Sequence, residues 1–229
     1  MGTSKGYIPP TTVHWTQAKR AVSEYIKNGD SGSRADAASK FARAMRHDMA
    51  TSSDFSSAVG NILAFARAVS HGGINNALQE FNRSDLVGKS SEDIILELIN
   101  EFTHSGSTTE DYLSAEAISS AFKELEIVDM EQLKDFDPDV LLKEMLIEYI
   151  KFSFAFRYEE KILMKKSPGE TKNIIREMNK YISDELHNKL KLDDLKNVDY
   201  NRMNSSRIVE KALEDAYHVF EMFYGGASV

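Results

Sequence analysis

Apolar residues recur at helical spacing along almost the whole chain. Residues 16–27, for example, place Ala18, Val22, Tyr25 and Ile26 on one face. Spacings of three and four residues are the period of an amphipathic α-helix. The pattern predicts helices over residues 16–27, 34–49, 53–70, 74–81, about 90–102, 107–125, 137–165, 170–190 and 206–224.

Helix-starting and helix-ending residues separate these periodic segments. Trp15 stands just before the first segment, where its side chain is expected to staple the helix start. Ser90 or Ser91 is expected to cap the fifth helix, in which Ile94, Ile95, Leu98, Ile99 and Phe102 should be buried. The other predicted breaks and caps are Asn28–Ser33, Gly72-Gly73, the capping box Ser107–Glu110, Asp137-Pro138 and Ser167–Glu170.

The same pattern predicts the fold class. Alternating runs of β-branched residues are absent, and no tandem repeat is visible. The sequence therefore predicts an all-α protein, a multi-helix bundle with a flexible, extended N-terminal tail. The expected division is a tail over 1–15, an N-terminal helical bundle over 16–128 and a C-terminal helical section over 129–229 packed on it, with a single domain as the alternative.

Composition narrows the class of protein. Hydrophobic residues make up 41% of the 229 residues and charged residues 28%, which is typical of neither a disordered nor a membrane protein. The most apolar stretch, Met145–Phe156, is interrupted by Glu148 and Lys151, and no secretory signal is visible. The chain has no cysteine, which excludes disulfides, thiol catalysis and Cys-ligated zinc. The cytoplasm is the expected location, and no membrane contact is expected.

Charge is unevenly distributed. The net charge is −8, with a balance of +4 over residues 1–50 and −12 over residues 51–229. An acidic body repels phosphate backbones, so nucleic-acid binding is disfavoured. It would have to use the basic residues of the first two helices, Lys19, Arg20, Lys40, Arg43 and Arg46.

Motifs for catalysis or metal binding are weak. Gly88-Lys89-Ser90 resembles the end of a phosphate loop, but Arg83 stands where the motif requires glycine, so a helix cap explains these residues better. No H-E-x-x-H and no G-x-S-x-G occurs. The sequence therefore predicts no catalytic residue and no enzyme.

One set of side chains has spacing compatible with metal ligands. Glu214, His218 and Glu221 share a helix face at spacings of four and three. An exposed polar face opposite Leu213, Tyr217 and Phe220 is the favoured interpretation, and a metal-dependent enzyme is the alternative. No metal is predicted.

The N-terminus offers a different chemistry. A small residue such as Gly2 after the initiator Met normally allows Met1 to be removed, which leaves an unhindered glycine amine. Such an amine has an unperturbed pKa of about 7.7–8.0, so a fraction of it is a free nucleophile near neutral pH. Gly6 stands where myristoylation needs Ser or Thr, and Pro9-Pro10 stiffens the segment. An acyl acceptor and an ordinary frayed terminus both remain open.

Several short motifs occur in the order and spacing of one known family. They are Met1-Gly2-Thr3-Ser4, WTQAKRA at 15–21, SGSR at 31–34, GINNAL at 73–78, LVGKS at 86–90 and STTEDYLSAEA at 107–117. Together with the long helix after Asp137-Pro138, they resemble QatB proteins, components of the Qat anti-phage defence system, over roughly residues 1–190.

The resemblance implies a role for the tail. QatB proteins are encoded beside an ATPase (QatA), a QueC-like enzyme (QatC) and a TatD-like nuclease (QatD). The resemblance implies that QatC uses ATP to activate a 7-carboxy-7-deazaguanine and passes the acyl group to Gly2. Gly2 would then carry a 7-amido-7-deazaguanine. Thr3 and Ser4 would hold the tail in the QatC cleft, and this chain would need no cofactor of its own. The alternative is a helical scaffold with an inert tail that docks the ATPase or the nuclease.

Overall fold

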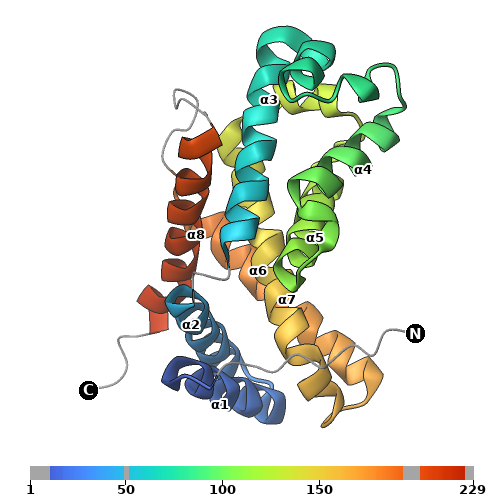
Figure 1. The fold of residues 1–229 in the computed structure, drawn as a ribbon. Helices are drawn as coiled ribbons and strands as arrows, with labels where there is room; N and C mark the ends of the chain where they lie inside the picture. The colour runs from blue at the N-terminus through green and yellow to red at the C-terminus, as the bar shows by residue number, and fades with distance from the viewer. Residues whose placement is uncertain (1–10, 49–51, 193–201, 225–229) are drawn as a thin grey trace.

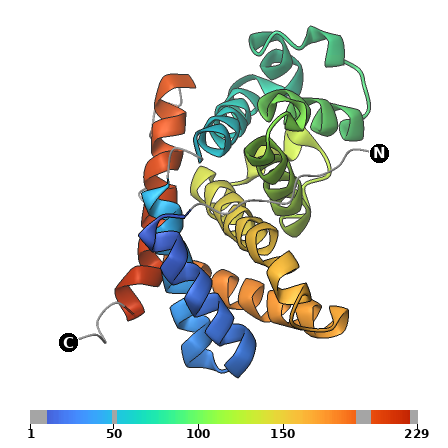
Figure 2. The ribbon, with the colours of Figure 1, turned by 60° about the horizontal axis from the view of Figure 1, so that its bottom comes forward.

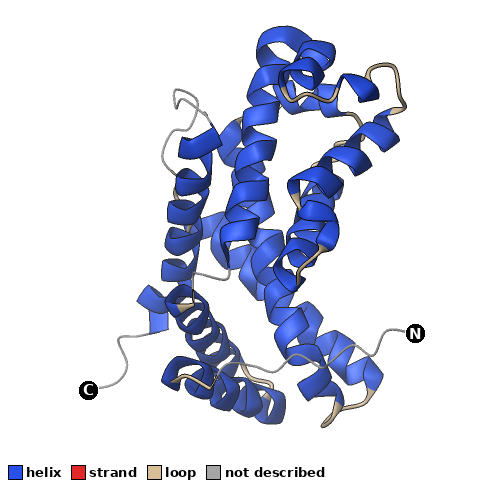
Figure 3. Cartoon of the chain, viewed as in Figure 1, coloured by secondary structure: helices blue, strands red, loops and turns tan. Residues whose placement is uncertain are grey.

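The computed structural model describes residues 11–48, 52–192 and 202–224, and all regular structure in these ranges is helical (Figure 3). The α-helices are α1 (Val13–Asn28), α2 (Ser31–His47), α3 (Ser53–Glu80), α4 (Ser91–Phe102), α5 (Thr109–Glu124), α6 (Pro138–Leu163), α7 (Pro168–Lys189) and α8 (Arg202–Tyr224). Short 3-10 helices are η2 (Ser84–Leu86), η3 (His104–Gly106) and η4 (Met130–Asp135). The predicted all-α class is confirmed, and residues 1–10 of the predicted tail lie outside the described residues.

Helix α6 runs through the middle of the molecule (Figure 1). Helices α3 and α8 pack side by side, α5 packs on α6, and the antiparallel pair α1–α2 packs against α8 through α2. Helix α7 turns back beside α6 after a short connection, which the rotated view also shows (Figure 2). Helices α4 and α5 form one side of the molecule, and α1 and α2 lie at its lower left (Figure 1).

The first two helices are joined by a turn shorter than predicted. Gly29 ends α1 with a left-handed φ of 69°, and Asp30 directly caps α2 by accepting a hydrogen bond of 2.8 Å from the Ser33 amide. At its other end α1 begins at Val13 after the N-cap Thr12. The prediction that Trp15 precedes the helix is therefore wrong, because Trp15 lies in the first turn with its side chain buried.

Most predicted caps are confirmed. Ser90 accepts a hydrogen bond from the Asp93 amide at the start of α4, and Ser167 forms a capping box with Glu170 at the start of α7. At α5 the capping box is shifted by one residue from the prediction, to Thr108 with Asp111. The shift has a tertiary cause, because the carboxylate of Glu110 binds side chains of α6 instead of the helix end.

Helix α3 bends at Gly73. This glycine has φ 74° and ψ 171°, which are not helical angles, so the helix is broken close to the predicted position. The amide of Ile74, freed by the break, donates a hydrogen bond of 2.8 Å to the Glu131 carboxylate in η4. The bend thereby ties the end of α3 to the segment that precedes α6.

One connected cluster of buried apolar side chains extends from Trp15 to Phe220. It includes residues on both sides of the predicted boundary at 129–137, so the division of the chain into domains stays a prediction. Helix α6 is buried on several sides, with Phe154 inside and Phe156 at 36% exposure. In the described part of the chain, no helix is long and apolar enough to cross a lipid bilayer.

Candidate functional site

The residues predicted to carry the function stand at the N-terminus. Gly2, Thr3 and Ser4 lie outside the described residues, so the structure describes only the base of the tail, which begins at Thr11. The structure of this base shows where the tail leaves the helical body.

Trp15 fixes the start of α1 to the body. Its side chain is 2% exposed, and its Nε1 donates a hydrogen bond of 3.2 Å to Asp48 at the end of α2. The Arg157 guanidinium of α6 lies 5.6 Å from the indole centroid, within cation–π range, and the Phe41 ring contacts the indole edge to face. Val13, two residues earlier, is 69% exposed. The chain therefore passes from a firmly held helix to solvent within one turn.

A pair of stacked histidines lies beside this anchor. The His14 and His47 rings are parallel, with centroids 3.9 Å apart. The Nδ1 atom of His14 is buried and has no hydrogen-bond partner among the described residues. Burial lowers the pKa of His14, and the positive charges of His47 and Arg43 lower it further. The pair is therefore stacked most stably when His14 is neutral.

Two of the three side chains whose spacing is compatible with metal ligands, His218 and Glu221, contact an arginine. Arg46 of α2 donates from Nε and Nη2 to the two carboxylate oxygens of Glu221, at 2.8 and 2.9 Å. Its Nη1 lies 3.1 Å from Nε2 of His218, which is 3.9 Å from Glu214. Over residues 11–48, 52–192 and 202–224, no group of three His, Asp or Glu side chains could hold a metal ion. The arrangement works as a clamp between α2 and α8.

This clamp also neutralises one of the cations on the basic face of α1 and α2. Arg46 is one of the five cations considered for nucleic-acid binding, and its charge is compensated by Glu221. Arg20 and Arg43 are exposed, whereas Lys19 and Lys40 are half-buried. The sequence could not reveal the clamp, because its two partners are 175 residues apart.

The segment Gly88-Lys89-Ser90 leads into a helix start, as the sequence predicted. Ser90 is the N-cap of α4, and its hydroxyl also donates a hydrogen bond of 2.6 Å to the Asp93 carboxylate. A 3-10 turn and not a strand precedes it, so the context of a nucleotide-binding loop is missing.

A partly buried ionic network joins α5 to α6. Glu110 accepts hydrogen bonds from the Tyr149 hydroxyl at 2.7 Å and from the Arg157 guanidinium at 3.1 Å. Arg157 also donates to the Ser153 carbonyl at 3.2 Å. Burial raises the pKa of Tyr149, which keeps its phenol protonated as a donor. Sequence reasoning missed this network because it assigned Glu110 to a capping box.

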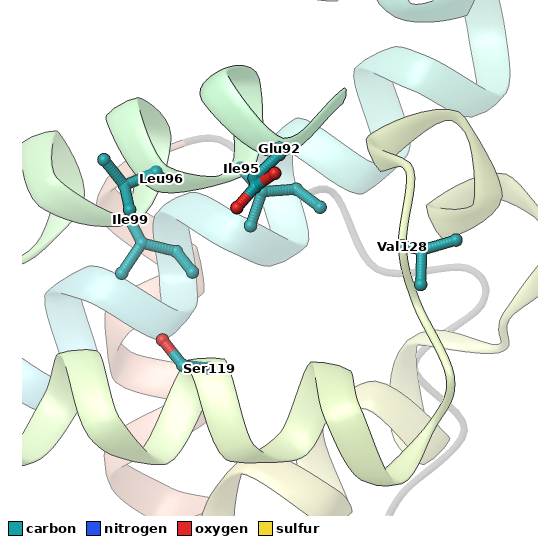
Figure 4. Close-up of a pocket in the computed structure, with 6 residues that line it drawn as sticks. All are labelled: Glu92, Ile95, Leu96, Ile99, Ser119 and Val128. Carbon is teal, nitrogen blue, oxygen red and sulfur yellow. The ribbon is translucent and has the colours of Figure 1, made fainter. Parts of the chain in front are cut away.

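A pocket of about 420 Å³ lies between α4 and α5 (Figure 4). Ile95 and Ile99 of α4 point toward α5, from which Ser119 points back, and Val128 stands at one end (Figure 4). Glu92 and Leu96 complete the lining. The prediction that Ile95 is buried is wrong, because it is half-buried and faces this pocket. The hydrophobic pattern of α4 predicts which face of the helix is apolar. It does not show that another element leaves part of this face uncovered.

Comparison with known proteins gives one match. The model of the family described as Qat anti-phage system associated protein QatB matches residues 38–220. These residues include α3 to α7, most of α2 and α8, the ionic network and the pocket. The tail lies before them, and Glu221 of the clamp lies directly after them. No curated protein and no solved structure matches the chain.

Proposed function

This chain belongs to the QatB family and is a component of a Qat anti-phage defence system, and we propose that it acts there as the protein substrate of the QueC-like partner QatC. In this proposal Met1 is the initiator residue and is removed. The amine of Gly2 then accepts a 7-deazaguanine through an amide bond. The chain supplies the acceptor and no catalysis.

The chemistry suits a glycine amine. Its nitrogen attacks the activated carbonyl carbon of the 7-carboxy-7-deazaguanine, the activating group leaves with the bonding electron pair, and the nitrogen loses a proton. The free amine is the nucleophile, and an unperturbed pKa of about 7.7–8.0 leaves a fraction of it unprotonated at neutral pH. Glycine has no side chain to obstruct the attack. ATP and the catalytic residues belong to QatC, and the reaction takes place in the cytoplasm.

The base of the tail supports this role. Gly2 and Thr11 are nine residues apart, which allows the amine to reach at most about 30 Å from the body. Trp15 holds the start of α1 through the Asp48 hydrogen bond and the Arg157 contact, so the tail has a fixed point of departure. Thr3 and Ser4 offer hydroxyls to the partner's cleft.

The observation that carries the proposal is the opening Met1-Gly2-Thr3-Ser4, placed ahead of a firmly held helix in a chain of this family. The test is the intact mass of the protein expressed with and without QatC, followed by fragmentation of its N-terminal peptide. We expect a mass gain on Gly2 that requires QatC. A plain glycine end in both samples would refute the proposal.

Two variants in the same tail sharpen the test. Gly2→Pro replaces the primary amine by a hindered secondary amine and should abolish the mass gain. Gly6→Ala is the matched control and should keep it, because position 6 offers no amine. Modification that persists in Gly2→Pro would show that Gly2 is not the acceptor.

A truncation separates this function from the scaffold alternative. Removing residues 2–10 keeps Thr12, which caps α1, so the helical body should fold unchanged. We expect defence to be lost while the truncated protein still associates with other Qat components. Full defence by the truncated protein would favour a helical scaffold that docks QatA or QatD with an inert tail.

A further inference from the structure

We propose that the groove between α4 and α5 binds a basic amphipathic segment of another protein. The residues of this surface are not part of the tail, and the proposal does not rest on the conjugation of Gly2. The groove comprises the six residues that line the pocket, Glu92, Ile95, Leu96, Ile99, Ser119 and Val128.

The groove has an apolar floor and an exposed apolar rim. Ile95 and Ile99 are one helical turn apart on α4 and line the floor. At the rim, Leu96 is 59% exposed and Val128 is 72% exposed. Exposed aliphatic side chains next to an apolar pocket are characteristic of protein-binding surfaces. Here they are the side chains that a partner would cover.

The surroundings of the groove are strongly acidic. Residues 84–135 contain thirteen Asp and Glu against three Lys, a balance of −10, whereas the whole chain has a net charge of −8. This section therefore carries more negative charge than the entire protein, and the remainder is slightly positive. A field of this sign attracts cationic partners and speeds their association.

Carboxylates close to the groove are free to receive a cation. Glu92 lines the groove, and Glu116 lies one turn before Ser119 on α5. Neither has an ion pair among the described residues, whereas Glu97 and Glu101, also on α4, bind Arg83. Lys123, one turn after Ser119, is the single cation of α5. One of these carboxylates thus lines the groove from α4, and the other stands one helical turn from the lining residue Ser119 on α5.

This combination favours a peptide segment over other ligands. A small-molecule site has several convergent polar groups, but the polar groups that line this groove are the Glu92 carboxylate and the Ser119 hydroxyl. Nucleic acid would be repelled by the charge. An apolar trough between two helices fits one face of an amphipathic helix, and acidic walls require Lys and Arg beside that face.

Photo-crosslinking within the assembled system tests the proposal. Benzoylphenylalanine is introduced at position 96 and, as a matched control, at position 164, because Met164 is an exposed apolar residue on another part of the surface, 76% exposed. Each protein is co-expressed with the other components of its own defence system, irradiated after purification of the complex, and analysed by peptide mass spectrometry. We expect an adduct from position 96 at least about tenfold stronger than from position 164. The adduct should join a segment of another protein that has a positive net charge and apolar residues at helical spacing.

Charge reversal tests the electrostatic part. With the photo-crosslinker at position 128, the double variant Glu92→Lys/Glu116→Lys should reduce the adduct at least about tenfold. The control Glu177→Lys, on α7, should leave it unchanged. Circular dichroism verifies that each variant keeps its helical content.

Three results would overturn the proposal. They are an adduct at position 96 no stronger than at position 164, an adduct to a neutral or acidic segment, and an adduct to this chain itself, either a second copy or its own tail. The same crosslinking in the Gly2→Pro background separates the two proposals, because this variant blocks the conjugation and leaves the groove intact.

Discussion

Glu110 on α5 and Arg157 on α6 form a partly buried ion pair, with 3.1 Å between the carboxylate and guanidinium groups. The side chains are 15% and 4% exposed. The second carboxylate oxygen of Glu110 accepts a hydrogen bond from the Tyr149 hydroxyl. The Arg157 guanidinium also faces the Trp15 indole. One arginine thus connects α5, α6 and the start of α1, so the point from which the tail departs is tied to the centre of the molecule.

Breaking this pair should cost much of the protein's stability. Glu110→Ala leaves the Arg157 charge buried without its partner, and we expect the free energy of unfolding to fall by about 3–5 kcal/mol. Urea denaturation followed by circular dichroism measures the loss. The exposed pair Lys180–Asp184 is the control, and Lys180→Ala should have little effect.

Replacing both partners of the ion pair by apolar residues should lower the free energy of unfolding much less than removing one partner. In Glu110→Leu/Arg157→Met, no charge remains buried, and apolar side chains of similar length fill the space. The double variant should therefore be more stable than Glu110→Ala. A double variant as unstable as the single one would contradict the explanation by an unpaired charge.

Removing the hydroxyl of Tyr217 should stabilise the protein. Its side chain is buried, and the hydroxyl has no hydrogen-bond partner among the described residues. We expect Tyr217→Phe to raise the free energy of unfolding at pH 7 by about 1 kcal/mol, since an unsatisfied buried group is removed. Tyr149→Phe should lower it by about 2 kcal/mol, because it loses a hydrogen bond to a carboxylate. Thermal denaturation of both variants in parallel would show whether the effects have opposite signs.

The same tyrosines predict instability in alkali. Burial raises the pKa of Tyr149 and of Tyr217. Above about pH 10 the unfolded phenol loses its proton while the native one keeps it, so the unfolded state binds fewer protons and stability falls as the pH rises. Each group contributes a slope of at most about 1.4 kcal/mol per pH unit. Urea titrations between pH 9 and 11 should give a shallower slope for Tyr217→Phe, and an unchanged slope would contradict this account.

Close packing of α3 on α8 should make Gly60 intolerant of a side chain. A Cβ atom there would lie 3.0 Å from the Ser206 backbone nitrogen and 3.2 Å from the Ser205 carbonyl carbon, so the backbone of α8 would have to move. We expect Gly60→Ala to lower the free energy of unfolding by about 1–3 kcal/mol. Gly169→Ala in α7 is the control, because nothing lies within 4 Å of its Cβ position, and urea denaturation should show no loss.

The histidine stack should weaken in acid. The pKa of His14 is lowered by burial and then by His47 and Arg43, and Glu221 opposes these effects. Below about pH 6.5 the unfolded state therefore binds a proton that the native state excludes, so the melting temperature should fall as the pH drops from 7 to 5. The fall should be smaller in His14→Gln. His71→Gln, at an exposed position on α3, should behave like the parent protein in the same scans.

The sequence by itself determined the helices and most of their ends. Apolar spacing predicted α1 to α8. Ser167 was predicted as a cap, and the cap of α4 was narrowed to Ser90 or Ser91, because a cap and its amide lie within three residues of each other. The break near Gly73 followed from a local backbone requirement in the same way. The opening Met1–Ser4, on which the proposed conjugation depends, is also a feature of sequence alone.

Only the tertiary structure decided which helix faces meet. It paired Arg46 with Glu221 across 175 residues, drew Glu110 from a predicted capping box into an ion pair with Arg157, and left Ile95 facing an open groove. Helical periodicity indicates which face of a segment is apolar, because hydrogen bonds and side-chain neighbours repeat over three or four residues. It contains no information on which other helix covers that face or whether any does, since this depends on how all the helices pack together.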